Sequence, residues 1–251
     1  MTERRIRLHC FAHAGAGVSG FRRWGQLLAP AGIDPVAHPL PGREGRAGEA
    51  RVTDRAALLA AMLPLVAPAP GAPRDPVVFY GHSLGGLVAH ALTRALRGVG
   101  LPGPDLLVLG ACPPPGTPNS LTDARHASDE DLLRLLVDLD GVPADPALAR
   151  FWRRMVLPVL RDDLRLGADL RDRALTDRAD PLPDQPMLVL AGDRDPLVPA
   201  EAMAGWSAYT TGPVYTRTLP GDHFFVRDPE LPTLLRRTAR VLTRTRTPIP
   251  A

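Results

Sequence analysis

The chain contains no lysine, and arginine supplies all 30 of its basic side chains. Together with 29 prolines, this bias indicates the codon usage of a GC-rich genome rather than a function. The basic residues are scattered among 27 acidic ones, as in the run Arg161-Asp162-Asp163, which predicts a solvated surface of mixed charge. Only six phenylalanines, three tyrosines and three tryptophans are present to stack nucleic-acid bases. We therefore expect no nucleic-acid partner, although the net charge is +3.

Long apolar runs are also missing. No stretch approaches the roughly 18 consecutive apolar residues of a transmembrane helix, and no apolar segment follows the charged N-terminus as it would in a signal peptide. Two cysteines are too few for a disulfide framework, and no Cys/His spacing is typical of a zinc site. The 251 residues, 45% of them hydrophobic, suffice for one substantial core. We expect a single domain over residues 1–251 and a cytoplasmic monomer with no membrane contact, metal or bound cofactor.

The most informative stretch is Val77–Gly86, which reads Val-Val-Phe-Tyr-Gly-His-Ser-Leu-Gly-Gly. An apolar run typical of a strand leads into Gly-x-Ser-x-Gly, and a helix-compatible stretch follows, which is the pattern of a nucleophile elbow. Glycine suits the positions two before and two after the serine, because the backbone there approaches the serine closely. Such a turn holds the Ser83 hydroxyl at a helix N-terminus, where backbone N–H groups favour negative charge. The pattern predicts that Ser83 is a nucleophile; the alternative is a glycine-rich turn with a solvated serine.

A nucleophilic serine needs a base, and the base needs a group that orients it. In α/β-hydrolases these residues follow the serine along the chain, first the acid and then the histidine. The apolar run Pro186–Gly192 leads into a loop with two carboxylates, Asp193 and Asp195, and the run Val214–Leu219 leads to His223. Each candidate therefore follows a predicted strand, at the edge where parallel sheets build their sites.

Of the seven histidines, only His223 follows the acidic loop. We favour Asp195 as the acid, because Pro196 and the apolar pair after it would anchor its side chain inward, whereas Asp193 would end the strand and face water. The preceding strand ends in Gly110-Ala111-Cys112-Pro113-Pro114-Pro115 and offers no carboxylate. The sequence therefore predicts a triad of Ser83, Asp195 and His223.

Acyl transfer also needs an oxyanion hole built from two backbone N–H groups. We expect one from Leu84, directly after the nucleophile, and the other from Ala14, in the small-residue loop after the predicted strand Ile6–Phe11. A glycine-rich loop at this place also suggests dinucleotide binding. However, Gly15-Ala16-Gly17-Val18-Ser19-Gly20 fits that fingerprint loosely, and the acidic partner expected about 20 residues further on is missing.

Strand and helix patterns alternate along the chain, which predicts an α/β fold with a mostly parallel, doubly wound sheet. In this arrangement the strand of the elbow lies between Cys10 and Cys112. Two strand spacings of about 4.8 Å then hold the thiols beyond the roughly 7 Å reach of a disulfide, so we expect two free thiols, as in a reducing cytoplasm. The expected elements are strand Ile6–Phe11, helix Phe21–Leu28, strand Asp34–His38, helix Arg55–Val66, strand Val77–Tyr80, helix Leu84–Leu96 and strand Leu106–Ala111.

The alternation stops between Pro113 and about Asp180, where a helical pattern predicts a lid insertion over approximately residues 115–175. Ser128, followed by three acidic residues, predicts the start of one helix. In a second helix Pro158 would cause a kink, and one apolar face would form at helical spacing. That face comprises Leu148, Phe151, Trp152, Met155 and Val159. Most of it would pack on the sheet. The residues that we expect to contact the substrate are Phe151 and Met155 from this face, together with His13 and Phe224.

Across these motifs the chain resembles the type II thioesterases that accompany polyketide synthases and nonribosomal peptide synthetases, within the α/β-hydrolase superfamily. The Pro-Gly-Arg-Glu-x-Arg stretch at Pro41–Arg46 is the most specific feature, because generic esterases and peptidases of this fold do not usually show it. Departures are small: Ala12 stands where the family often has proline, and Gly86 where it often has alanine. The resemblance extends over nearly the whole chain, through the segments Phe11–Gly15, Phe21–Trp24, Pro39–Arg46, Tyr80–Gly86, Gly192–Val198 and Gly221–Phe225.

This resemblance implies that Ser83, Asp195 and His223 form the triad and that Ala14 and Leu84 form the oxyanion hole. It also implies hydrolysis of acyl or aminoacyl thioesters on the phosphopantetheine arm of acyl or peptidyl carrier protein domains. No cofactor would be needed, because phosphopantetheine arrives on the carrier protein. The residues alone indicate only a serine hydrolase with a lid. A carboxylesterase or lipase, a severed product-cyclising thioesterase domain and a ligand-binding receptor on a hydrolase fold remain as alternatives.

Overall fold

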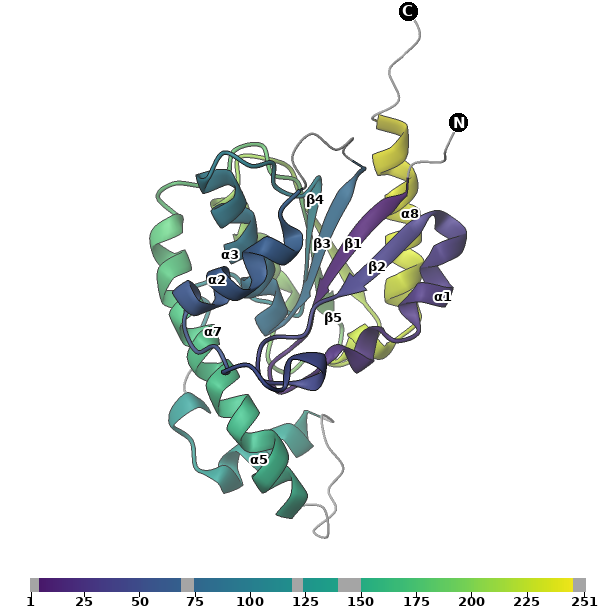
Figure 1. The fold of residues 1–251 in the computed structure, drawn as a ribbon. Helices are drawn as coiled ribbons and strands as arrows, with labels where there is room; N and C mark the ends of the chain where they lie inside the picture. Colours follow the sequence, from purple (N-terminus) through teal and green to yellow (C-terminus); the bar gives the residue numbers. More distant parts are fainter. Residues whose placement is uncertain (1–4, 69–74, 119–123, 140–149, 246–251) are drawn as a thin grey trace, which may run out of the picture.

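The protein is described by a computed structural model that covers residues 5–68, 75–118, 124–139 and 150–245 (Figure 1). Six strands form one parallel sheet in the order β2-β1-β3-β4-β5-β6. This sheet confirms the predicted α/β-hydrolase fold class. The strands are β1 (Ile6–Phe11), β2 (Ile33–Ala37), β3 (Val77–His82), β4 (Leu106–Gly110), β5 (Met187–Gly192) and β6 (Val214–Leu219).

Helices cover both faces of the sheet, as a parallel sheet with near-continuous apolar strands requires. On one face α2 (Arg55–Val66), α3 (Leu84–Gly98) and the second half of α7 (Leu157–Asp177) bury their apolar side chains against the strands. On the other face α1 (Trp24–Leu28) and α8 (Glu230–Thr245) do the same (Figure 1). The sheet is therefore doubly wound, and the carboxyl ends of its strands are left for the loops that follow them.

Most predicted elements lie where the sequence places them, and the first helix differs most. In place of one helix over Phe21–Leu28, the structure has a short 3₁₀-helix at Val18–Phe21 and then α1. The break lets Phe21 and Trp24 both turn inward, with their rings 5.0 Å apart and each against the ring of Tyr80.

The inserted segment is helical, as predicted, over the residues that the structure describes. Its first long helix, α5 (Asp129–Asp138), begins at Ser128, whose hydroxyl accepts a hydrogen bond of 3.1 Å from the Asp131 N–H. A wide, π-helical turn at Trp152–Val156 then leads into α7, which has Pro158 in its first turn. Figure 1 shows α5 and the start of α7 projecting from the main body.

The apolar face predicted for this second helix does not form. Phe151 and Met155 are 54% and 56% exposed, and Leu148 lies outside the described residues. The physical reason is that another apolar side of the helix is buried, and Met155, two residues before Leu157, lies about 200° around the helix from that side. The side chains that turn inward against α5 are instead Leu157, Leu160 and Leu164.

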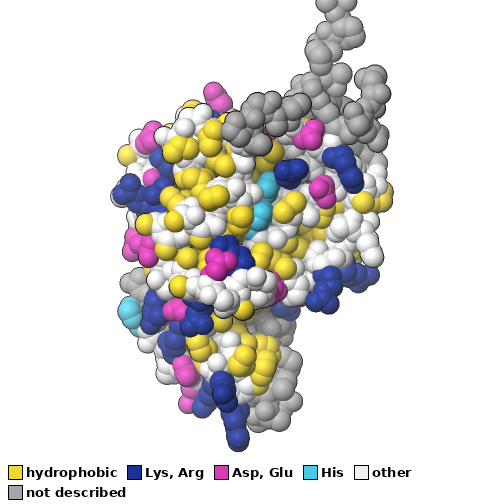
Figure 2. Space-filling model, viewed as in Figure 1, with side chains coloured by type: hydrophobic (Ala, Val, Ile, Leu, Met, Phe, Trp, Pro, Cys, Tyr) yellow, Lys and Arg dark blue, Asp and Glu magenta, His cyan; other side chains and the backbone are white. Residues whose placement is uncertain are grey.

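The surface of the face shown in Figure 2 carries arginine and acidic side chains intermixed rather than separated by sign. Cys10 and Cys112 are both buried and free, and β3 lies between their strands in the sheet. Within the described part of the chain, no helix combines the length and apolar character needed to cross a bilayer.

Candidate active site

The predicted elbow stands between β3 and α3. Ser83 joins the two elements in a strained conformation, with φ 53° and ψ −116°, a type of outlier that concentrates at functional sites. A Cβ atom at Gly81 would overlap the Gly85 carbonyl, and one at Gly85 would overlap the Phe11 carbonyl. Both glycines are therefore required by close backbone approach, and the turn presents the Ser83 hydroxyl at the N-terminus of α3.

His223 lies between the serine and a carboxylate. Its Nε2 is 3.2 Å from Ser83 Oγ, and its Nδ1 is 2.8 Å from Asp195 Oδ2. The other carboxylate oxygen of Asp195 accepts bonds from the backbone N–H groups of Leu197 and Val198, at 2.9 and 3.2 Å. Because a carboxylate can only accept, Nδ1 of His223 carries the proton and Nε2 is left to accept one from the serine. The His223 and Asp195 side chains are 3% and 0% exposed.

The second carboxylate of the same loop faces away from the histidine. Asp193 is 46% exposed, and its Oδ1 accepts a 2.8 Å hydrogen bond from the Gly221 N–H. It therefore holds together the two loops that follow β5 and β6, while Asp195 contacts the imidazole.

A buried pair, His82 and Tyr80, is hydrogen-bonded to the backbone of His223, and sequence reasoning assigned no role to His82. His82 Nε2 lies 2.7 Å from the backbone carbonyl of His223, and its Nδ1 lies 2.8 Å from the Tyr80 hydroxyl. Burial lowers the pKa of His82 well below its ordinary value, so the ring is neutral. A carbonyl only accepts, so Nε2–H donates to it and Nδ1 accepts from Tyr80. This pair fixes the backbone that carries His223.

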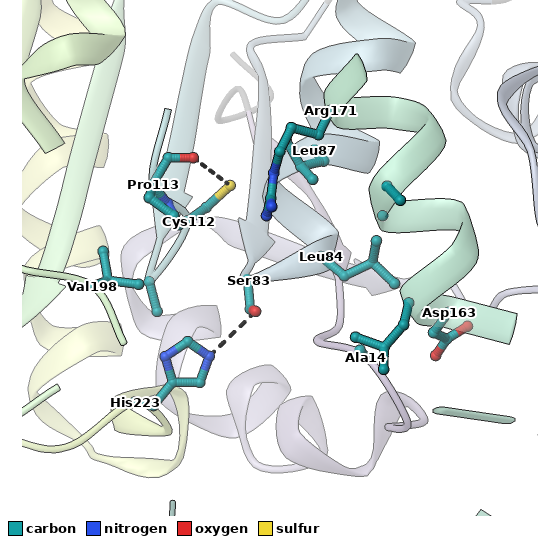
Figure 3. Close-up of a pocket in the computed structure, with 14 residues that line it drawn as sticks. Ala14, Ser83, Leu84, Leu87, Cys112, Pro113, Asp163, Arg171, Val198 and His223 are labelled. Carbon is teal, nitrogen blue, oxygen red and sulfur yellow. Dashed lines mark hydrogen bonds between the residues drawn. The ribbon is translucent and has the colours of Figure 1, made fainter. Parts of the chain in front are cut away.

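The two predicted oxyanion donors lie at one end of a pocket beside Ser83 (Figure 3). Neither the Ala14 N–H nor the Leu84 N–H has an acceptor within the residues that the structure describes. The next N–H along the loop, that of Gly15, donates a 2.7 Å bond to Asp163 Oδ2. Asp163 thus holds in place the loop to which Ala14 belongs.

Asp163 is also the centre of a buried ion pair. Its two oxygens accept bonds of 2.6 and 2.8 Å from the Arg43 guanidinium, which also donates to the Ala16 carbonyl at 2.9 Å. The two side chains are 1% and 9% exposed. Burial raises the pKa of Asp163, and the bonds from Arg43 and Gly15 oppose that rise. The sequence prediction of a solvated Arg161-Asp162-Asp163 run is therefore wrong for Asp163, which joins α7 to the Pro-Gly-Arg-Glu loop.

The pocket encloses about 50 Å³ between the elbow, the end of β4 and α7. Most of its walls are apolar or small side chains, with Asp163 and Arg171 as the charged exceptions among the described lining residues. Figure 3 shows Ser83 and His223 at one side and Arg171 reaching in from α7. The lining residues include Ala14, Leu84, Leu87, Cys112, Leu164 and Arg171.

The four residues predicted to contact substrate do not line this pocket. The rings of His13 and Phe224 lie 4.9 Å apart beside the triad, tilted by 56° to each other, and Phe224 also contacts the ring of His223 edge to face at 5.3 Å. Burial, the nearby His223 and Arg227 lower the pKa of His13 to about 3. Phe151 and Met155 are exposed on the inserted helical segment. Within the described residues, no group of three His, Cys, Asp or Glu side chains is arranged to hold a metal ion.

Two named thioesterases are similar in sequence to most of this chain. Thioesterase PikA5 of Streptomyces venezuelae is 30% identical over 224 residues, which are 89% of this chain and 76% of that protein. The probable cadicidin biosynthesis thioesterase of Streptomyces griseus is 31% identical over 226 residues, which are 88% of this chain and 58% of that protein. This chain thus spans little more than half of the second relative.

Solved structures of thioesterases have a fold similar to that of this chain. RedJ, a thioesterase from the prodiginine biosynthetic pathway in Streptomyces coelicolor, superposes with a TM-score of 0.77 at 29% identity, over 92% of this chain and 85% of RedJ. The type II thioesterase BorB from the borrelidin biosynthetic cluster gives a TM-score of 0.75 at 28% identity, over 94% of this chain and 93% of BorB. These matches confirm the resemblance to type II thioesterases. Since the thioesterase domain family also matches residues 6–241, the chain belongs to the thioesterase family of hydrolases.

Proposed function

We propose that the protein hydrolyses acyl or aminoacyl thioesters on the phosphopantetheine arm of carrier protein domains in polyketide or nonribosomal peptide biosynthesis. The observation that carries the proposal is the hydrogen-bonded series Asp195, His223 and Ser83 beside a narrow pocket, with distances of 2.8 and 3.2 Å. Several relatives are named for such pathways, among them the gramicidin S biosynthesis protein GrsT. Their pathways support the substrate class.

In the first step, His223 Nε2 takes the proton of the Ser83 hydroxyl while Oγ attacks the thioester carbonyl. The carbonyl oxygen becomes an oxyanion that accepts hydrogen bonds from the Ala14 and Leu84 N–H groups. Asp195 stabilises the charged imidazole, since its carboxylate stays bonded to Nδ1–H. The tetrahedral intermediate collapses, the C–S bond breaks, and the imidazolium returns its proton to the leaving thiolate of phosphopantetheine.

In the second step, water replaces the thiol. His223 removes a proton from the water as its oxygen attacks the Ser83 ester, and the same oxyanion hole stabilises the second tetrahedral intermediate. Collapse releases the free acid and returns the proton to Ser83 Oγ. Because a thiolate leaves more readily than an alkoxide, we expect this hydrolysis to be the slower step.

This reaction uses no cofactor of the protein's own, because phosphopantetheine arrives on the substrate. We propose a monomer that works in a reducing cytoplasm. The two buried free thiols, Cys10 and Cys112, support the reducing compartment. Burial raises the pKa of Cys112 to about 12, so this thiol next to the elbow stays protonated and leaves the nucleophile's role to Ser83.

The proposed function is tested by intact-mass spectrometry of a panel of acyl-carrier proteins after incubation with the enzyme. Each carrier protein should lose the mass of its acyl group and keep its phosphopantetheine. Ser83→Ala should lose several orders of magnitude in rate and should no longer react with a fluorophosphonate probe. Ser207→Ala, at an exposed serine, is the matched control and should behave as the unmodified enzyme. Carrier proteins that keep their acyl groups while p-nitrophenyl esters are hydrolysed would indicate a carboxylesterase.

A further inference from the structure

The stretch Pro41–Arg46 is the most specific sequence motif of the chain, yet none of its residues lines the pocket beside Ser83. Its backbone holds a costly conformation. Glu44 has a φ of 47°, in the left-handed region that residues other than glycine rarely adopt. Such outliers concentrate at functional sites, where the surrounding structure holds them in place. The conformation of Glu44 therefore indicates that this stretch has a role in function.

The loop that carries the proposed oxyanion donor Ala14 has little regular structure of its own. It follows β1 as a turn, which the Ala16 N–H closes by donating to the His13 carbonyl at 3.2 Å. Gly15 in this turn has a φ of 75°, which glycine adopts without steric cost. Because one turn bond contributes little to stability, the position of the Ala14 N–H depends on contacts with other parts of the chain.

The first half of this loop is bonded to the buried ion pair. Asp163 on α7 accepts a 2.7 Å hydrogen bond from the Gly15 N–H. Arg43, its partner, donates a 2.9 Å hydrogen bond to the Ala16 carbonyl. Since Arg43 belongs to the Pro41–Arg46 stretch, this stretch contacts the loop directly.

Glu44, the next residue of the stretch, holds the second half of the loop. Both oxygens of its carboxylate accept from the Val18 N–H at 3.0 Å. A Cβ atom at Gly17 would overlap this carboxylate, so the glycine allows its close approach. Glu44 is exposed, in contrast to the buried Asp163 and Arg43, so its replacement should have a small effect on stability.

The strained backbone explains how two successive side chains reach the same loop. In an extended chain the side chains of neighbouring residues point to opposite sides. Arg43 is extended, with φ −147° and ψ 158°, whereas Glu44 has the left-handed conformation. This change of conformation directs both side chains to the loop after β1, where they bond Ala16 and Val18.

We propose that Glu44 is a positioning residue of the oxyanion hole and that the Pro41–Arg46 stretch, together with Asp163, clamps the loop that carries Ala14. The inference rests on the proposed thioester hydrolysis. Hydrogen bonds weaken steeply when the donor is misaligned, and a donor that is held in place needs no reorganisation when charge develops on the substrate oxygen. The clamp therefore acts on the transition state more than on substrate binding.

The test replaces Glu44 by methionine, which is similar in length and has no oxygen to accept the Val18 N–H. With an acyl-pantetheine thioester as substrate, kcat should fall by about 10- to 100-fold while KM changes by less than about twofold, because the oxyanion forms only in the transition state. Glu44→Gln keeps an acceptor oxygen and should retain most of the kcat. Glu230→Met, at an exposed glutamate that begins α8, is the matched control and should behave as the unmodified enzyme.

A trifluoromethyl ketone analogue of the substrate distinguishes positioning from a general structural role. It forms a hemiketal with Ser83, and the anionic oxygen of this hemiketal occupies the oxyanion hole. Glu44→Met should therefore weaken its binding by the same factor as it lowers kcat/KM. Tm should fall by less than about 6 °C, since one exposed hydrogen bond is lost. End-point labelling with a fluorophosphonate counts the folded active sites in each preparation.

A Glu44→Met variant that keeps its kcat, or that loses kcat without weaker binding of the ketone, would overturn the inference and leave the proposed function intact. Equal losses of kcat in Glu44→Met and Glu44→Gln would overturn it as well. If the unmodified enzyme hydrolyses no acyl thioester on pantetheine or on a carrier protein, the proposed function fails and the inference fails with it.

Discussion

Replacing Asp163 by asparagine should destabilise the fold by about 3–5 kcal/mol, the usual cost of removing one partner from a buried ion pair. Solvent does not reduce this cost, because Asp163 and Arg43 are only 1% and 9% exposed. The cost comes mainly from Arg43, which is left buried without a counter-charge. The pair itself contributes less than this to stability, since burial raises the pKa of Asp163 rather than lowering it.

Thermal unfolding measures this loss. For a chain of this size each kcal/mol lowers Tm by about 2–4 °C, so Asp163→Asn should lower Tm by about 6–20 °C. The exposed arginine of the Arg134–Glu130 pair supplies the control, because its side chain is 60% exposed. Arg134→Gln should change the stability by less than about 1 kcal/mol. The double variant Asp163→Leu, Arg43→Met should recover much of the loss, since it leaves no unpaired charge.

Asp163→Asn should also lower kcat. Asp163 accepts a hydrogen bond from the Gly15 N–H, which lies next to the proposed oxyanion donor Ala14. Complete loss of one oxyanion donor costs about 10²–10³ in kcat, which sets the upper bound for a displaced loop. An Asp163→Asn variant that unfolds within 2 °C of the unmodified protein and keeps its full kcat would refute this reasoning.

Three further predictions concern the triad, its support and acid stability. Asp195→Asn should lower kcat by about 10⁴, as for the triad carboxylate of serine proteases, while Asp193→Asn should change it little; steady-state kinetics showing the reverse order would reassign the acid. His82→Phe should lower kcat, and His82→Gln, which keeps a donor for the backbone carbonyl, should restore part of it; equal losses at equal Tm would contradict a positioning role. Burial lowers the pKa of His9 to about 3 and of His38 to about 4, from 6.5. The unfolded chain therefore binds more protons below pH 6.5, and stability should fall with pH between 6.5 and 4, by up to about 1.4 kcal/mol per pH unit for each histidine. Urea unfolding should show a shallower pH dependence after substitution of both histidines by glutamine, and an unchanged slope would contradict this account.

The strands and the elbow were predictable because their signals are local. An apolar run of strand length needs cover on both faces wherever it occurs, and Gly81 and Gly85 report a close backbone approach that only glycine allows. The acid and the base follow from strand order, since parallel strands bring their carboxyl ends to one edge. Strand order and the glycine pattern of the elbow therefore explain why Asp195 and His223 lie next to Ser83 in the structure.

Residues whose surroundings come from distant parts of the chain were not predictable. Asp163 stands in a run of charges that looks solvated, and Arg43, its partner, lies 120 residues away. The apolar face predicted for the second inserted helix was wrong for another reason. Helical spacing identifies residues that share one side of a helix but not which side is buried, and here Leu157, Leu160 and Leu164 turn inward while Met155 is exposed.

The helix α7 has a consequence for the order of events during catalysis. Its first turns pack on α5 through Leu160, its later turns lie in the main core through Leu170, and Asp163, bonded to Arg43, stands between them. A movement of the inserted segment that included all of α7 would have to break this buried pair, so the favourable movement displaces α5 and the π-helical turn alone. Amide exchange should accordingly be faster before Asp163 than after it, within one helix. The part of α7 that lines the pocket beside Ser83 then keeps its shape while α5 moves, so the fit of an acyl group is decided on entry, before α5 returns.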